Sequence, residues 1–137
     1  MGRIVAIDYG TKRIGLAVTD PLKIIATGLD VVHPLQIFQY LEEYHKKENI
    51  EKFIVGHPKT VKNVDSDSMK HIKGFVRKLK EKFPDIPVEM IDERFTSVIA
   101  HRAMLDGGLK KKARQNKETV DKISATLILQ TYMQQNQ

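Results

Sequence analysis

The feature that most constrains the fold is a pair of short apolar runs separated by a turn that contains glycine. Residues 4–7 (IVAI) are uniformly apolar and rich in β-branched side chains, and residues 14–18 resume the pattern beyond Gly10. A run this short and this uniform is typical of a central strand buried on both faces. Glycine gives the backbone the freedom to turn between two such runs. Residues 3–19 therefore predict two strands joined by a tight connection.

Asp8 stands where the first of these strands leaves the core. An ionised carboxylate on a buried strand is costly unless a metal ion, a hydrogen bond or an opposite charge compensates it. One interpretation is an aspartate that caps the turn. The other is a metal or phosphate site at the strand end.

The rest of the chain alternates between strand-like and helix-like segments. Short apolar runs predict strands at 24–32, 52–56 and 88–91, and apolar residues at helical spacing predict helices at 35–48, 66–83, 96–106 and 119–135. The last helix is expected to bury Val120, Ile123, Leu127 and Ile128. Alternating strands and helices predict a mixed sheet with helices packed on its faces, and the length suits one domain over residues 1–137.

Composition narrows the environment and the partners. The 137 residues contain no cysteine, which excludes disulfides, thiolate metal sites and cysteine nucleophiles and fits a reducing cytosol. The N-terminal residues show no leader pattern, and no apolar run approaches the ~20 residues that span a bilayer. We therefore expect a cytoplasmic protein without membrane association. The net charge of +6 favours polyanionic partners such as nucleic acid.

Three carboxylates lie where secondary structure elements begin or end. Asp8 closes the first strand, Glu93 follows the fifth, and Asp121 falls in the predicted first turn of the last helix. Three oxygen donors without His or Cys suit Mg²⁺ or Mn²⁺, and two such ions can assist phosphodiester hydrolysis. Each acid also has a structural explanation. Asp121 can complement the helix dipole, and Glu93 can pair with Arg94 or lie at the surface.

A basic segment precedes Asp121. Its positive charges lie within eight residues that contain no acid: Lys110, Lys111, Lys112, Arg114 and Lys117. Such a run is either a solvated loop or a clamp for the phosphate backbone of a nucleic acid. Its position directly before Asp121 favours the clamp. The lysine-rich face of helix 66–83 is interpreted as mainly a solvated surface.

Four sequence blocks together resemble the YqgF/RuvX family, small bacterial proteins of the ribonuclease H-like superfamily. The blocks are IDYGTKRIGLAVTDP at 7–21, IVGHP at 54–58, DERFTS at 92–97 and VDKISATLILQTYM at 120–133. The resemblance covers nearly the whole chain. It implies an α/β ribonuclease H-like fold, with a five-stranded mixed sheet, helices on both faces, and Asp8, Glu93 and Asp121 at the acidic positions of the family. His57 and the following KTVKNVDSDS depart from the usual Gly-Leu-Pro and glycine-containing loop.

The resemblance implies a nuclease that uses Mg²⁺ or Mn²⁺ at Asp8, Glu93 and Asp121. Family members are described as nucleases that process the 5′ end of pre-16S ribosomal RNA and as Holliday junction resolvases. The partner is then structured RNA or branched DNA, whose backbone would be held by Lys12, Arg13, Arg94 and the basic segment 110–117. A nucleic-acid-binding module without catalysis is the alternative. The Asp-x-Gly-Thr turn also resembles the phosphate loop of actin-type ATPases, but those proteins need two such halves.

Overall fold

A five-stranded mixed sheet forms the centre of the molecule. The computed structural model describes residues 2–10, 12–57, 66–92 and 117–135. Within these ranges the strand order is β3-β2-β1-β4-β5. The strands are β1 (Arg3–Asp8), β2 (Ile14–Thr19), β3 (Ala26–Val32), β4 (Ile50–His57) and β5 (Val88–Asp92). β1 and β2, and likewise β2 and β3, are antiparallel, while β4 is parallel to both β1 and β5. The sequence prediction of a central first strand is confirmed.

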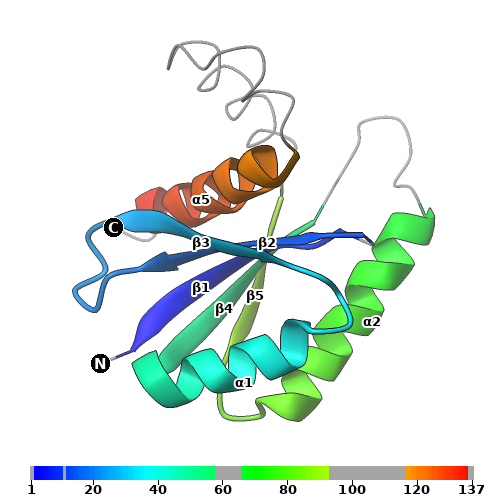
Figure 1. Cartoon of the computed structure of the whole chain (residues 1–137), viewed down its shortest axis with the longest axis horizontal. Coiled ribbons are helices and arrows are strands. Elements are labelled where there is room, and N and C mark those ends of the chain that lie inside the picture. The colour runs from blue at the N-terminus through cyan, green and yellow to red at the C-terminus, as the bar shows by residue number, and fades with distance from the viewer. Residues whose placement is uncertain (1, 11, 58–65, 93–116, 136–137) are drawn as a thin grey trace.

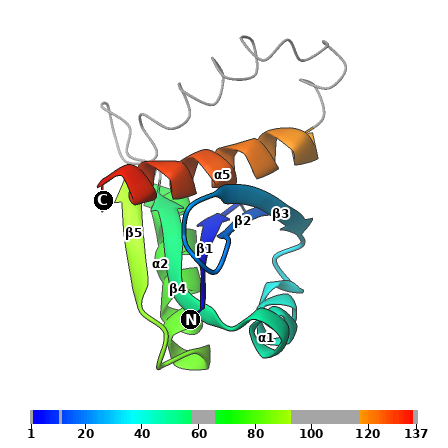
Figure 2. The ribbon, with the colours of Figure 1, turned by 90° about the vertical axis from the view of Figure 1, so that its left-hand side faces the viewer.

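Helices cover both faces of this sheet. Two of them, α1 (Ile37–Glu48) and α2 (Ser66–Lys82), pack on one face, and α5 (Lys117–Gln135) crosses the other (Figures 1 and 2). The β1 side chains alternate between two hydrophobic clusters, as expected for a strand with both faces buried. Val5 and Ile7 belong to the cluster under α1 and α2, whereas Ile4 and Ala6 belong to the cluster under α5.

Small residues on three neighbouring strands form a row beneath α5. Ala6 on β1 is the Cα partner of Ala17 on β2, which in turn is the partner of Gly28 on β3. Both alanines are fully buried. A Cβ placed on Gly28 would lie 3.4 Å from Thr126 Oγ1 and 3.5 Å from Lys122 Cβ. The small-residue row therefore brings α5 close to the sheet near the beginning of the helix.

The connection between β1 and β2 depends on Gly10. A Cβ at this position would lie 2.5 Å from the carbonyl oxygen of Arg13, far inside normal van der Waals contact. Only glycine therefore permits this close approach of backbone to backbone.

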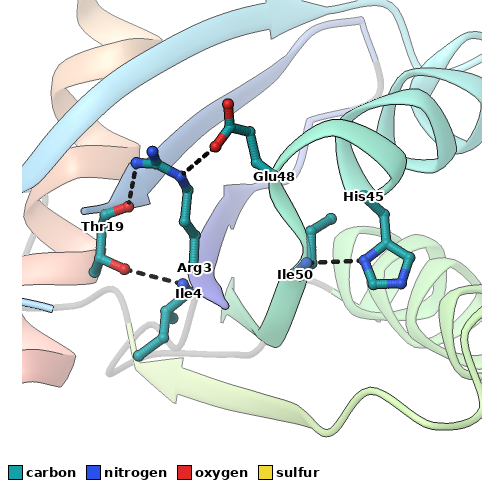
Figure 3. Close-up of polar contacts among 6 residues, drawn as sticks. All are labelled: Arg3, Ile4, Thr19, His45, Glu48 and Ile50. Carbon is teal, nitrogen blue, oxygen red and sulfur yellow. Dashed lines mark hydrogen bonds and ion pairs between the residues drawn. The ribbon is translucent and has the colours of Figure 1, made fainter. Parts of the chain in front are cut away.

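Polar contacts tie β1 to β2 and α1 at the edge of the sheet where β1 begins (Figure 3). The Arg3 guanidinium donates to Glu48 Oε2 and to the carbonyl oxygen of Thr19, both at 3.1 Å. The buried Thr19 hydroxyl accepts a hydrogen bond from the backbone N–H of Ile4 at 3.0 Å. These hydrogen bonds satisfy the backbone N–H of Ile4 and the carbonyl oxygen of Thr19, and they hold the first residues of β1 in place.

Two element boundaries differ from the sequence prediction. β3 begins at Ala26, so Ile24 and Ile25 lie outside the strand and are 68% and 61% exposed. The carboxylate of Asp20 accepts hydrogen bonds from both of their backbone N–H groups, at 2.7 and 2.8 Å, and this turn delays the strand. α1 begins at Ile37, which leaves Leu35 outside the helix and 90% exposed.

The buried face of the last helix was predicted incorrectly. Ile128 is buried as expected, but Ile123 and Leu127 are only half-buried, and the side chain of Val120 lies outside the described part. Ala125, Leu129 and Tyr132 complete the buried face instead. An alanine in this position suits a helix that lies close to the small-residue row. The predicted helix 96–106 falls outside the described residues. Among the described helices, none has the length and apolarity to cross a membrane.

Candidate active site at the carboxyl edge of the sheet

The three parallel strands end at one edge of the sheet, which we call the carboxyl edge. Asp8, the last residue of β1, is the Cα partner of Gly56 on β4. One position further, His57 at the end of β4 is the partner of Asp92 at the end of β5. Figure 1 shows the first turns of α5, in orange, on the side of the molecule where these strands end. Ligands of open α/β sheets bind at such an edge.

Asp8 lies on the face of the sheet that α5 covers. Successive side chains of a strand point to opposite faces, and Ile4 and Ala6 pack beneath α5. Asp8 continues this series two residues further along β1 and is half-buried. The strand alternation therefore assigns Asp8 to the same face as α5, the helix that carries Asp121.

Asp121 is the fifth residue of α5, because the helix begins at Lys117 rather than at Thr119. Asp121 therefore lies one residue beyond the first turn, in which it was expected, and Lys117 belongs to the helix. The favourable effect of a carboxylate on the helix dipole falls off within the first turn. The side chain of Asp121 lies outside the described part of the structure.

The backbone next to Asp121 lies against the sheet. Lys122 Cβ would be 3.5 Å from a Cβ on Gly28, in the middle of β3. Figure 2 shows α5 crossing from its first turns over β3 and β2 to its last turns over β4 and β5.

Two of the predicted cationic residues lie in the turn that follows Asp8. Lys12 and Arg13 belong to the turn between β1 and β2, where Lys12 is exposed and Arg13 is half-buried. Both therefore lie at the carboxyl edge. The remaining predicted residues lie outside the described part: Glu93, Arg94, Lys110, Lys111, Lys112, Arg114 and the side chain of Lys117.

His57 and Asp92 were not among the predicted site residues. The register of β4 and β5 places their backbones opposite each other at the carboxyl edge. A sequence signal existed for both, since each directly follows a short apolar strand. Glu93 comes immediately after Asp92 in the chain.

No cluster of three or more His, Asp or Glu side chains suited to a metal ion occurs among the residues that the structure describes. Two of the three predicted acids, Glu93 and the side chain of Asp121, are outside that set. The donor chemistry nevertheless fits a hard cation, because all three are carboxylates.

At the opposite edge of the sheet, polar side chains of β4, β5 and α5 interact with one another. Lys52 Nζ donates to the hydroxyl oxygen of Tyr132 at 2.7 Å and lies 3.6 Å from a carboxylate oxygen of Glu89. The hydrogen bond with Tyr132 is the main cause that raises the pKa of Lys52. These contacts fasten the end of α5 to β4, at a groove of about 410 Å³. Its walls are Ile4, Lys23, Glu51, Lys52, Pro87, Tyr132 and Met133.

The architecture is an α/β ribonuclease H-like fold. Two solved structures share this fold: T. thermophilus RuvC in complex with a Holliday junction substrate and the Fowlpox virus resolvase in complex with Holliday junction DNA. The first has a TM-score of 0.58 at 18% identity and covers 98% of this chain and 96% of its own. The second has a TM-score of 0.53 at 13% identity and covers 98% of both chains.

The sequence then assigns the family. The model of the RuvX family, described as Holliday junction resolvase, matches residues 2–135, and the chain belongs to this family. A "Putative pre-16S rRNA nuclease" of Phocaeicola vulgatus is 60% identical over 134 residues, covering 98% of this chain and 96% of the relative. A protein of the same name from Christiangramia forsetii is 52% identical over 133 residues, covering 97% of this chain and 98% of the relative.

Proposed function

We propose that the protein is a metal-dependent nuclease that hydrolyses phosphodiester bonds at the carboxyl edge of the sheet. The observation that carries this proposal is the position of Asp8. It ends the central strand on the face covered by α5, the helix that bears the second predicted acid, Asp121. Membership in a nuclease and resolvase family supports the same chemistry.

In this proposal Asp8, Glu93 and Asp121 hold Mg²⁺ or Mn²⁺. When bound, two such ions would activate a water molecule and stabilise the leaving oxygen of a phosphodiester. Asp8 suits the central position because its strand is hydrogen-bonded on both sides, to β2 and to β4. A ligand on a strand held in this way keeps its geometry when the substrate arrives.

The cationic residues around this edge would bind the phosphate backbone. Lys12 and Arg13 lie in the turn that follows Asp8. Lys and Arg contacts to phosphate supply most of the sequence-independent affinity for nucleic acid. We propose the same role for Arg94, Lys110, Lys111, Lys112, Arg114 and Lys117.

The substrate that we favour is the 5′ end of pre-16S ribosomal RNA, because the relatives that are 50–60% identical carry that name. A four-way DNA junction is the second candidate, and the description of the family favours it. A nucleic-acid-binding module without catalysis is the third. We further propose that residues 1–137 act as one nuclease domain in the cytoplasm.

The test is cleavage of end-labelled pre-16S rRNA and of a four-way DNA junction, with Mg²⁺, with Mn²⁺ and with chelator. Asp8→Asn and Asp121→Asn should each abolish cleavage while the protein stays folded. Asp85→Asn is the matched control, because Asp85 is an exposed carboxylate in the turn before β5. Cleavage that survives both active-site variants would refute the assignment of the acids. Metal-independent binding without cleavage of either substrate would favour the non-catalytic module.

A further inference from the structure

A glycine interrupts the exposed face of α2, and no described residue packs against it. Gly74 lies in the middle of the helix, where glycine is less favourable than alanine. A Cβ built on Gly74 meets no atom of the described residues within 4 Å, so neither packing nor close approach of a described element requires glycine. The position is therefore open to a partner from outside the fold.

Basic side chains surround this open position. On a helix the surface neighbours of a residue lie three and four positions away. Those of Gly74 are Lys70, His71, Arg77 and Lys78, and all four side chains are exposed. We call this group, with Gly74 at its centre, the α2 notch.

The charges of the α2 notch are not neutralised within the described part of the chain. None of its cationic side chains takes part in an ion pair there, whereas Lys82 near the end of α2 lies 3.9 Å from Glu42. On α1 the lysines Lys46 and Lys47 stand on a helix that also carries three glutamates. The described side chains of α2 include one acid, Glu81, which lies three positions after Lys78 and four after Arg77, and no ion pair joins it to either among the described residues. Uncompensated like charges on one helix face repel one another. The notch is therefore better suited to an anionic partner than to solvent alone.

The α2 notch lies toward the carboxyl edge. Phe75, the residue after Gly74, stacks on Tyr9 with ring centroids 4.7 Å apart, and Tyr9 directly follows Asp8. Phe83, just beyond the end of α2, contacts Phe53 in the first half of β4 instead, with centroids 5.3 Å apart. In Figure 1 the first turns of α2 accordingly lie on the side where β1 ends.

We propose that the α2 notch binds the phosphate backbone of the nucleic acid beyond the cleavage site, on the sheet face opposite α5. The ammonium groups of Lys70 and Lys78 and the guanidinium of Arg77 contact phosphate oxygens. Gly74 removes the side chain that would otherwise keep the backbone of the nucleic acid away from the helix. This inference rests on the proposed function, because it extends the path of the same substrate.

The test measures binding to a labelled DNA duplex and to an RNA duplex of the same sequence, in chelator, over a series of salt concentrations. The double variant Lys70→Gln/Lys78→Gln is compared with Lys46→Gln/Lys47→Gln, which removes the same charge from α1. The logarithm of the binding constant falls linearly with the logarithm of the salt concentration, and each phosphate contact contributes about 0.9 to the steepness of this slope on DNA. Loss of two phosphate contacts should therefore reduce the steepness of the slope on the DNA duplex by about 1.8. The α1 control should keep the wild-type slope.

A second variant distinguishes an effect of the open position at Gly74 from an effect of net charge. Gly74→Ala adds a Cβ in open space and leaves the charge unchanged, so it should raise the melting temperature while it weakens duplex binding. An equal loss of affinity in the two double variants would overturn the proposal, and so would a more stable Gly74→Ala protein with wild-type affinity.

The two proposals fail in different ways. If the notch variants bind the duplex as tightly as the wild-type protein, and the wild-type protein shows metal-dependent cleavage, the α2 notch proposal is overturned and the nuclease proposal stands. If these variants bind more weakly but the wild-type protein cleaves neither substrate, the α2 notch proposal is supported and the nuclease proposal is overturned.

Discussion

Replacing Ala17 by valine should move α5 and thereby reduce catalysis without a change in any proposed catalytic residue. Ala17 is fully buried in the small-residue row, between Ala6 and Gly28 and beneath α5. Ala125 on α5 is also fully buried. The helix can make room for two extra methyl groups only by rising from the sheet, and this would displace the backbone that carries Asp121.

The magnitude follows from the full burial of Ala17 and from the close contact between α5 and the neighbouring Gly28. If room existed, burying two further methyl groups would stabilise the fold by about 1.6 kcal/mol, at about 0.8 kcal/mol each. Inserting such groups into a filled core instead costs about 1–3 kcal/mol. We therefore expect Ala17→Val to lower the free energy of unfolding by about 1–3 kcal/mol.

Urea unfolding gives the stability change, and cleavage of pre-16S rRNA under conditions where the variant is fully folded gives the functional change. Val18→Ile is the control, because Val18 lies on the same strand but packs in the cluster under α1 and α2. It should leave cleavage by the folded protein unchanged. Ordinary surface substitutions change the free energy of unfolding by less than about 0.5 kcal/mol. A loss that small in Ala17→Val, together with full cleavage activity, would refute the reasoning.

Three further predictions concern polar groups. Thr19→Val should cost about 1–3 kcal/mol in urea unfolding, because it leaves the buried N–H of Ile4 without its acceptor, whereas Thr19→Ser should keep most of the stability. Burial raises the pKa of Tyr40 to about 12, so its contribution to stability is complete below pH 10 and is lost as the pH rises to about 12. Burial also raises the pKa of Tyr44, so absorbance titration should show one late-ionising tyrosine fewer in Tyr40→Phe than in the wild-type protein. Ionisation of every tyrosine near pH 10 would contradict this. The backbone N–H of Ile25 is the main cause that holds the pKa of Asp20 below its usual value of 3.8. The carboxylate therefore stabilises the fold above that pH, and the contribution disappears as the pH falls through the lowered pKa. Asp20→Asn should weaken the acid dependence of the urea midpoint, and an unchanged dependence would count against this.

Local sequence patterns are sufficient to predict the central strands and the fold class. The run 4–7 is apolar at every position, and only a strand covered on both faces buries all of it. The helical spacing in α2 and the glycine turn at Gly10 are equally local signals. Together they predicted a mixed sheet with helices on both faces, and the structure confirms it.

Tertiary structure decided what local patterns do not encode. The buried face of α5 was misjudged because burial there depends on the sheet beneath it. The small-residue row brings the helix close and makes Ala125 a buried residue, while the more apolar Leu127 is only half-buried.

The same distinction applies to the candidate site. Asp8, Glu93 and Asp121 were selected from the sequence by their positions near strand and helix ends. Asp8 shares a face of the sheet with α5 because strand alternation and helix packing together bring them there. His57 and Asp92 are 35 positions apart in the chain, and the parallel register of β4 and β5 alone makes them neighbours at the carboxyl edge. Chain order fixes which residues follow each strand, but hydrogen bonding between strands fixes which of those residues meet.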